Sequence, residues 1–228
     1  MQHNRIGYLV IHGFGGSKYE VEPFTDHLIE KNCEVACPML KGHTGKRRDM
    51  KNATYKDWID SAEQELLKLK ESSDEIVLIG FSMGGLIAVN LACKHQVKAV
   101  ITINTPIYYW NFKIVLNNLI EDIKSKSLNN FNRYFYAGMK SPIAAMYNFQ
   151  LLLAQTKPKI NKIHCPFLIM QAEDDDTVRI RSVDYIYNNL PSENKKIKLY
   201  NKGGHLILRS PTANQVIADI NAFLYSLP

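Results

Sequence analysis

Residues 76–85 read IVLIGFSMGG, and this stretch decides the fold. Its first four residues have the length and β-branched content of a buried parallel strand, and the helical pattern Leu86–Val89 follows directly. A serine at so sharp a turn takes a strained backbone conformation, for which Gly80 and Gly84 leave room on either side. The stretch therefore predicts strand, tight turn and helix, with Ser82 at the apex as a candidate nucleophile. The alternative is a glycine-rich junction with a bystander serine.

Apolar strand candidates alternate with helical patterns along most of the chain. The expected strands are Ile6–Ile11, Glu34–Cys37, Ile76–Ile79, Ala99–Ile103, Phe167–Gln171 and Lys196–Tyr200. The expected helices are Glu22–Lys31, Tyr55–Leu69, Met83–His95, Val183–Asn189 and Thr212–Tyr225. Such alternation predicts an α/β fold with a mostly parallel sheet and helices on both faces. Ligands of such sheets lie beyond the carboxyl ends of the strands, so every loop after a strand is a candidate site.

The alternation is interrupted once, by residues 107–163. This insert holds 10 of the chain's 23 aromatic residues and includes a further helical stretch, Pro142–Gln155. A crossover between parallel strands needs only one helix, so we expect a helical cap inserted between the strands at Ala99–Ile103 and Phe167–Gln171. Residues 1–106 and 164–228 then form the core domain. The alternative use of the aromatic side chains is to pack the insert's own small core.

Length and composition favour one globular unit. A chain of 228 residues supports one sizeable core, and no apolar run approaches the roughly 18 residues that cross a bilayer. The start of the chain lacks the long apolar segment of a secretory peptide, so we expect a cytoplasmic protein. The cysteines lack paired spacing, which predicts reduced, mostly buried thiols and no metal site. They are Cys33, Cys37, Cys93 and Cys165.

The formal net charge of +6 is concentrated in the insert, where eight lysines and arginines face only Glu121 and Asp122. A nucleic-acid partner is not expected, because no basic helix face or recognisable binding module accompanies the charge. The basic residues either keep an aromatic segment in solution or favour anionic esters and weak association with an anionic membrane surface. Stable membrane insertion is not expected, since no segment has the required length.

The loop after the first strand, residues 11–17, reads IHGFGGS and could bind a phosphate or an oxyanion. A dinucleotide fingerprint starting at Gly13 would need glycine where Lys18 stands. A P-loop would need serine or threonine after Gly45-Lys46, where the chain has Arg47. Both nucleotide interpretations therefore fail, and no cofactor is expected.

An oxyanion site needs one backbone N–H from a loop after an early strand and a second from the residue after the nucleophile. Phe14 and Met83 occupy these two positions. The alternative for His12-Gly13 is a strand-ending turn with a structural histidine.

A nucleophilic serine requires a histidine to accept its proton and a carboxylate to orient that histidine. Four acids, residues 173–176, follow the strand at Phe167–Gln171, and His205 follows the last strand behind two glycines. The chain order serine, aspartate, histidine is that of α/β-hydrolases. An acidic run is more often a solvated loop, and a lone histidine is more often structural. Their positions directly after predicted strands favour a catalytic role here.

With these elements placed, residues 6–227 resemble the capped α/β-hydrolases, most closely the small bacterial carboxylesterases related to monoacylglycerol lipases. The matching pieces are His12-Gly13-Phe14-Gly15-Gly16, Lys41-Gly42-His43, Gly80-Phe81-Ser82-Met83-Gly84-Gly85, the acidic loop and Gly203-Gly204-His205. The family's acid loop places the catalytic aspartate three positions after a small residue, which here implies Asp175, with Asp176 second and Asp174 third. Thr44 departs from a glycine common in relatives, and this leaves the role of His43 open.

The resemblance implies a serine hydrolase that cleaves short- to medium-chain or monoacylglycerol-like esters through an acyl-enzyme intermediate. Ser82, Asp175 and His205 would be catalytic, with Phe14 and Met83 donating backbone N–H groups to the oxyanion. No cofactor or metal is implied, the partner is a small-molecule ester, and the protein would be a monomer or homodimer. A thioesterase, amidase or lactonase would use the same residues. A non-catalytic ligand-binding relative is the alternative from another class.

Overall fold

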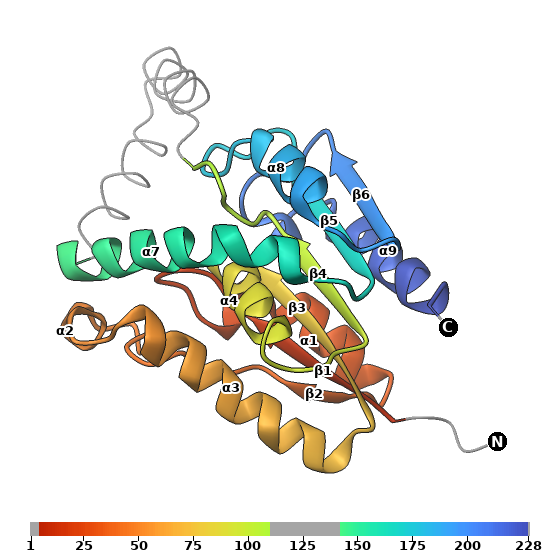
Figure 1. The fold of residues 1–228 in the computed structure, drawn as a ribbon, viewed down its shortest axis with the longest axis horizontal. Coiled ribbons are helices and arrows are strands. Elements are labelled where there is room, and N and C mark those ends of the chain that lie inside the picture. The colour runs from red at the N-terminus through yellow and green to blue at the C-terminus, as the bar shows by residue number, and fades with distance from the viewer. Residues whose placement is uncertain (1–4, 110–141, 228) are drawn as a thin grey trace.

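The computed structural model describes residues 5–109 and 142–227, and its centre is a six-stranded sheet of order β2-β1-β3-β4-β5-β6 (Figure 1). The strands are β1 Ile6–Ile11, β2 Glu34–Ala36, β3 Glu75–Phe81, β4 Ala99–Ile103, β5 Phe167–Ala172 and β6 Lys195–Tyr200. Each pair of neighbouring strands is parallel. Since parallel strands end at the same edge, the loops after β1, β3, β5 and β6 reach one side of the sheet.

The helices and short 3-10 turns fill the connections between these strands. They are η1 Lys18–Glu20, α1 Glu22–Glu30, α2 Arg47–Lys51, α3 Tyr55–Ser72, α4 Met83–Ala92, α7 Ile143–Thr156, η2 Lys157–Lys162, α8 Arg181–Asn189, η3 Ile207–Arg209 and α9 Ala213–Tyr225. The predicted elements are confirmed, with ends that differ by at most three residues. The five-residue helix α2 was not predicted, because so short a helix shows no full apolar period.

Helices cover both faces of the sheet. Successive side chains along a strand point to opposite faces and pack into one of two hydrophobic layers. On β3, Ile76 and Leu78 pack with α3, α4, α7 and α8, whereas Val77 and Ile79 pack with α1 and α9. In Figure 1, α3, α4 and α7 lie on one side of the strands and α1 and α9 on the other. A central strand that is buried on both faces explains the continuous apolar run before the glycine turn.

The described end of the insert packs onto the core. Helix α7 lies across α4 and α3 (Figure 1). Tyr109, the last described residue before 110–141, forms an antiparallel bridge with Val178. The predicted cap as a separate unit stays a prediction, because residues 110–141 lie outside the described part of the chain.

Only three of the insert's eight basic residues are described, and two of these three make internal contacts. The Lys157 ammonium lies 5.0 Å from the centre of the Tyr108 ring, and Lys159 donates to Asn90. The other five lie outside the described residues, and they are Lys113, Lys124, Lys126, Arg133 and Lys140. Most of the basic surface that we considered for anionic partners therefore remains a prediction.

The cysteines are free, and each is partly buried against the hydrophobic core. They lie beside the ends of elements rather than within them, at positions 33, 37, 93 and 165. Within residues 5–109 and 142–227, no helix combines the length and apolar character of a membrane span. The same residues contain no cluster of histidine, cysteine and carboxylate side chains suited to a metal ion.

Candidate active site

Ser82 stands at the apex of the turn between β3 and α4. Its φ of 52° and ψ of −121° are strained for a residue with a side chain. A Cβ on Gly80 would lie 2.3 Å from backbone atoms of Gly84, and one on Gly84 would lie 2.1 Å from the carbonyl oxygen of Ile11. Both glycines are therefore required by close backbone approach, as the motif predicted. The Ser82 N–H donates to the Ile103 carbonyl at 2.8 Å, which ties the turn to β4.

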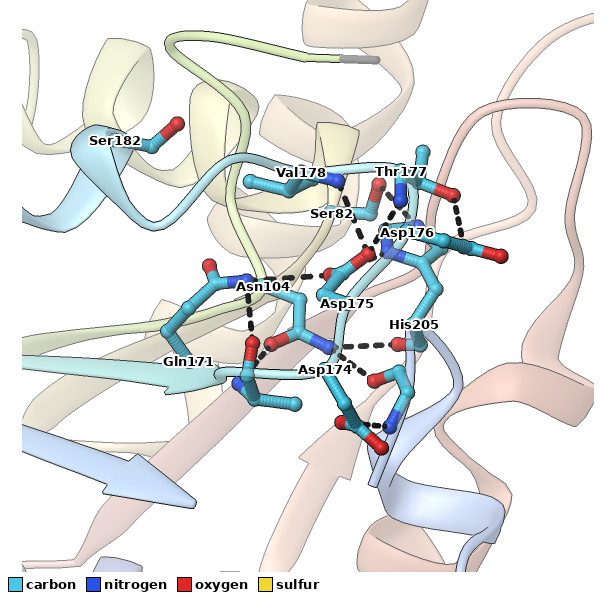
Figure 2. A network of polar contacts seen from close by, with 12 residues as sticks. Ser82, Asn104, Gln171, Asp174, Asp175, Asp176, Thr177, Val178, Ser182 and His205 are labelled. Atoms are coloured by element: carbon cyan, nitrogen blue, oxygen red, sulfur yellow. Dashed lines mark hydrogen bonds and ion pairs between the residues drawn. The ribbon is translucent and has the colours of Figure 1, made fainter. Parts of the chain in front are cut away.

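His205 lies between Ser82 and the acidic loop. Its Nε2 is 3.1 Å from Ser82 Oγ, and its Nδ1 is 2.9 Å from Asp175 Oδ2 (Figure 2). These atoms come from three loops that are up to 123 residues apart. The structure thus brings the predicted serine, histidine and aspartate into one hydrogen-bonded chain.

The charge around His205 favours its protonated form. Burial by itself lowers the pKa of the imidazole, but Asp175 beside Nδ1 outweighs it, and Glu20 and Asp176 add to the effect. The net result is a raised pKa. This environment stabilises the imidazolium ion that forms when the ring accepts a proton.

The three candidate aspartates have different partners. Asp175 is buried, and its Oδ1 accepts the N–H groups of Thr177 at 2.8 Å and Val178 at 3.0 Å, which leaves Oδ2 facing His205. Asp174 instead accepts the N–H groups of residues 203 and 204, at 3.2 and 2.7 Å. Asp176 accepts the Thr177 hydroxyl at 3.0 Å. Figure 2 shows these contacts side by side, with Asp175 oriented against the ring.

The two predicted oxyanion donors lie in the loop after β1 and at the start of α4. Phe14 is in a turn that the Gly16 N–H closes by donating to the Gly13 carbonyl at 3.3 Å. Met83 is the first residue of α4, where backbone N–H groups lack partners within the helix. Among the described residues, neither the Phe14 nor the Met83 N–H donates to another protein atom.

An aromatic cluster surrounds the side chain of Phe14. Its ring centre is 5.3 Å from that of Phe149 on α7, 5.8 Å from that of Trp58 on α3 and 6.3 Å from that of His43. Burial lowers the pKa of His43 to about 4, so its ring is neutral and adds no charge here. His43, whose role the sequence left open, therefore packs as a neutral ring within the aromatic cluster around Phe14.

The known family that matches this chain covers residues 58–225 and is described as the BAAT / Acyl-CoA thioester hydrolase C-terminal family. The chain belongs to this family. The matched residues span β3, β5 and β6 with the loops that follow them. They therefore include Ser82, Asp175 and His205, whereas the Phe14 loop precedes the match.

Curated relatives are similar over most of this family member's length. It is 28% identical to the thermostable monoacylglycerol lipase of Bacillus sp. (strain H-257), over 86% of this chain and 81% of the relative. It is 23% identical to a carboxylesterase of Bacillus subtilis (strain 168), over 96% of this chain and 92% of the relative.

Solved structures confirm the α/β-hydrolase fold of this family member. A structure from work on the metagenome-derived lipolytic enzymes LipS and LipT has a TM-score of 0.81 and 20% identity, over 97% of this chain and 94% of that one. A soluble variant of the monoglyceride lipase of Saccharomyces cerevisiae, in complex with a substrate analogue, has a TM-score of 0.71 and 21% identity, over 98% and 87%. At these identities the likeness shows the fold alone.

In this member of the BAAT / Acyl-CoA thioester hydrolase C-terminal family, Asn104 joins the loops of the site, and our sequence analysis missed it. It follows β4 directly and is fully buried. Its Nδ2 donates to the carbonyls of His205 at 2.7 Å and Gly204 at 3.0 Å, and its Oδ1 accepts the Ala172 N–H at 2.9 Å (Figure 2). An asparagine directly after a buried parallel strand was the available signal, because the other loops of the site also follow strands.

Proposed function

We propose that this α/β-hydrolase is a serine esterase that cleaves carboxylic esters with an apolar acyl or alcohol group. The single observation that carries the proposal is the hydrogen-bonded chain from Ser82 Oγ through His205 to Asp175. The curated relatives named as a monoacylglycerol lipase and a carboxylesterase support an ester as substrate. The aromatic cluster around Phe14 supports a substrate with an apolar group next to the ester.

In the proposed reaction, Ser82 Oγ attacks the ester carbonyl while His205 Nε2 takes the serine proton. Asp175 holds Nδ1–H and stabilises the imidazolium. The N–H groups of Phe14 and Met83 donate to the negative oxygen of the tetrahedral intermediate. His205 then gives its proton to the leaving alcohol, and Ser82 remains acylated.

The second half of the reaction repeats the first with water as the nucleophile. His205 removes a proton from water, the hydroxide attacks the acyl-enzyme carbonyl, and the same two N–H groups bind the oxyanion. The proton returns to Ser82 as the carboxylic acid leaves. The net reaction consumes one ester and one water and yields one acid and one alcohol.

The test measures hydrolysis of p-nitrophenyl and glycerol esters of increasing chain length by the unaltered protein and by Ser82→Ala. We expect the substitution to lower kcat by about 10³-fold or more, because removing the nucleophile leaves only binding and the oxyanion donors. Circular dichroism and thermal unfolding should match between the two proteins. Near-normal turnover by folded Ser82→Ala would contradict the covalent mechanism.

A thioesterase is the second candidate, and the family description, which names acyl-CoA thioester hydrolase, is the observation that favours it. Comparing kcat/KM for acyl-CoA and oxygen esters of equal acyl length separates the two. The alternative of a non-catalytic binding protein is tested with a fluorophosphonate probe. Labelling that Ser82→Ala abolishes supports an activated serine, and folded protein that remains unlabelled favours the binding protein.

A further inference from the structure

Glu20, at the end of η1, binds the loop that carries Phe14. Its Oε2 accepts the Gly13 N–H at 2.8 Å, and its carboxylate is partly buried. Burial raises the pKa of this carboxyl, while the Gly13 N–H and the nearby His205 oppose the rise. Nothing in the proposed reaction requires a carboxylate here, so its position needs another explanation.

The last glycine of the loop, Gly16, accommodates this carboxylate. A Cβ on Gly16 would lie 2.1 Å from Glu20 Oε2, and the three heavy atoms nearest to that Cβ all belong to Glu20. The Gly16 N–H in turn closes the turn onto the Gly13 carbonyl. The carboxylate therefore contacts the first and last residues of the turn that presents the Phe14 N–H.

The 3-10 turn that carries Glu20 is itself held against the histidine loop. Arg209, four residues after His205, donates from Nε to the Tyr19 carbonyl at 2.6 Å and stacks its guanidinium 3.3 Å from the centre of the Tyr19 ring. It also pairs with the Glu22 carboxylate. Arg209 therefore holds the backbone before Glu20, at Tyr19, and a side chain after it, at Glu22.

Glu20 also adds negative charge near the imidazole. The ionisable groups that face His205 are Asp175 and Asp176 on the acid loop and Glu20 on η1, and all three raise its pKa. Glu20 differs from the other two because it also binds the loop that carries the Phe14 N–H. The Glu20 side chain thus contacts the loop that carries the Phe14 N–H, and its charge raises the pKa of His205.

We propose that Glu20 is a positioning residue that holds the Gly13–Gly16 turn, so that the Phe14 N–H meets the oxyanion. This inference rests on the proposed serine hydrolase function. The hydrogen bond to the Gly13 N–H carries this role, and the effect of the Glu20 charge on His205 is a separate consequence that substitution can distinguish.

The first experiment compares Glu20→Ala and Glu20→Gln with Glu30→Ala and Glu30→Gln, which alter an exposed glutamate at the end of α1. Glu20→Ala should lower kcat by about 10- to 100-fold with KM changed less than about 3-fold, since loss of a whole oxyanion donor costs about 10²–10³. Glu20→Gln keeps an oxygen acceptor for Gly13 and should recover most of that kcat.

The pH profile reports the charge. Both Glu20 variants should move the acidic limb of the kcat/KM profile to lower pH, because removing a negative charge lowers the pKa of His205. Neither Glu30 variant should move it. A purely structural role for Glu20 would change stability without shifting this limb.

Gly16→Ala tests the same contact from the other side. The new methyl group would displace the Glu20 carboxylate, so we expect a loss of kcat similar to that of Glu20→Ala. The double variant Gly16→Ala/Glu20→Ala should lose no more kcat than either single variant, because both substitutions remove the same interaction. Additive losses would overturn the proposed contact.

The outcomes separate this inference from the proposed function. If the unaltered protein shows no hydrolysis that depends on Ser82, the proposed function fails. If that activity is present but Glu20→Ala keeps kcat within about 2-fold of Glu30→Ala, with the acidic limb unmoved, the role of Glu20 fails while the function stands. The role of Glu20 also fails if Glu20→Ala lowers kcat only in proportion to a lowered Tm and leaves the acidic limb of the kcat/KM profile unmoved.

Discussion

Asn104 combines a left-handed backbone with hydrogen bonds to two other loops. Its φ is 47°, a conformation that asparagine tolerates better than most residues with a side chain. Its amide joins Ala172, before the acid loop, to the carbonyls of Gly204 and His205. At the residue scale, this buried amide therefore helps to set the separation between Asp175 and His205, together with Asp174, which accepts the N–H groups of residues 203 and 204.

We expect Asn104→Ala to lower the free energy of unfolding by about 3 kcal/mol, because one buried and two partly buried backbone groups lose their partner. Asn104→Gly should cost about 1 kcal/mol less, since glycine adopts positive φ without strain. Both should lower kcat by about 10-fold or more, because His205 loses its anchor. Urea unfolding and ester kinetics measure the two effects. Equal stabilities of the two variants would contradict the argument from backbone strain.

The choice among the acidic residues is also tested at this scale. Asp175→Asn should lower kcat by about 10⁴-fold, the size expected when a triad carboxylate no longer fixes the histidine tautomer. Asp176→Asn should lower it by less than about 10-fold, because that carboxylate binds Thr177 rather than His205 Nδ1. Kinetics on one p-nitrophenyl ester compare them. The reverse order would assign the role to Asp176.

At the scale of elements, a buried polar cluster joins α4, the helix after Ser82, to the end of the insert. Asn90 on α4 donates from Nδ2 to the Leu86 carbonyl at 2.8 Å and to the Thr156 hydroxyl at 2.7 Å. Its Oδ1 accepts the ammonium of Lys159 on η2. Polar groups buried together in this way stabilise a contact only while every partner is present.

Asn90→Ala should therefore lower the free energy of unfolding by about 2–3 kcal/mol, because the Lys159 ammonium and the Thr156 hydroxyl lose a buried partner. Asn189→Ala is the matched control. Asn189 also lies on a helix and bonds a carbonyl four residues earlier, at 2.8 Å, but it is exposed. Its loss should cost less than about 0.5 kcal/mol in urea unfolding. Similar costs for both variants would show that burial of the cluster adds nothing.

At the scale of the whole molecule, electrostatics couple activity and stability to pH in opposite directions. The proposed general base must be neutral before it accepts the serine proton, and the pKa of His205 is raised above 6.5. The acidic limb of kcat/KM should therefore have its midpoint above 6.5. A midpoint at or below that value would contradict the raised pKa.

The stability effect has the opposite sign. Protonated His205 is favoured in the fold, so its contribution is complete below the ordinary imidazole pKa of 6.5 and is lost as the pH rises through the raised value. The difference in free energy of unfolding between the unaltered protein and His205→Gln should shrink as the pH increases. Urea unfolding from about pH 5 to about pH 9 measures this difference. A difference in free energy of unfolding that stays constant with pH would contradict the expected stabilisation by protonated His205.

Much of the fold could be predicted from local pattern. Five of the six strands, and each predicted helix, were placed by apolar periodicity and by flanking turns, within three residues of their ends. The short edge strand β2, Glu34–Ala36, was also found, although only three residues pair there. Helix α2 was missed because five residues carry too little pattern. Local sequence thus records an element when it is long enough to show its period.

By itself, the sequence determined the order of strands and helices and the turn at Ser82, because periodicity and glycine placement are properties of neighbouring residues. It also restricted the candidate acid to a short acidic run, and the family resemblance implied Asp175 within that run. The tertiary structure places the Asp175 carboxylate against His205, and only it revealed the contacts of Asn104 and Glu20. Their contacts reach residues 7 to 101 positions away along the chain. The Asn104 contacts exist only after parallel strands bring their ends to one edge, and the Glu20 contact exists only once the loop between β1 and η1 has folded, so no local pattern indicates them.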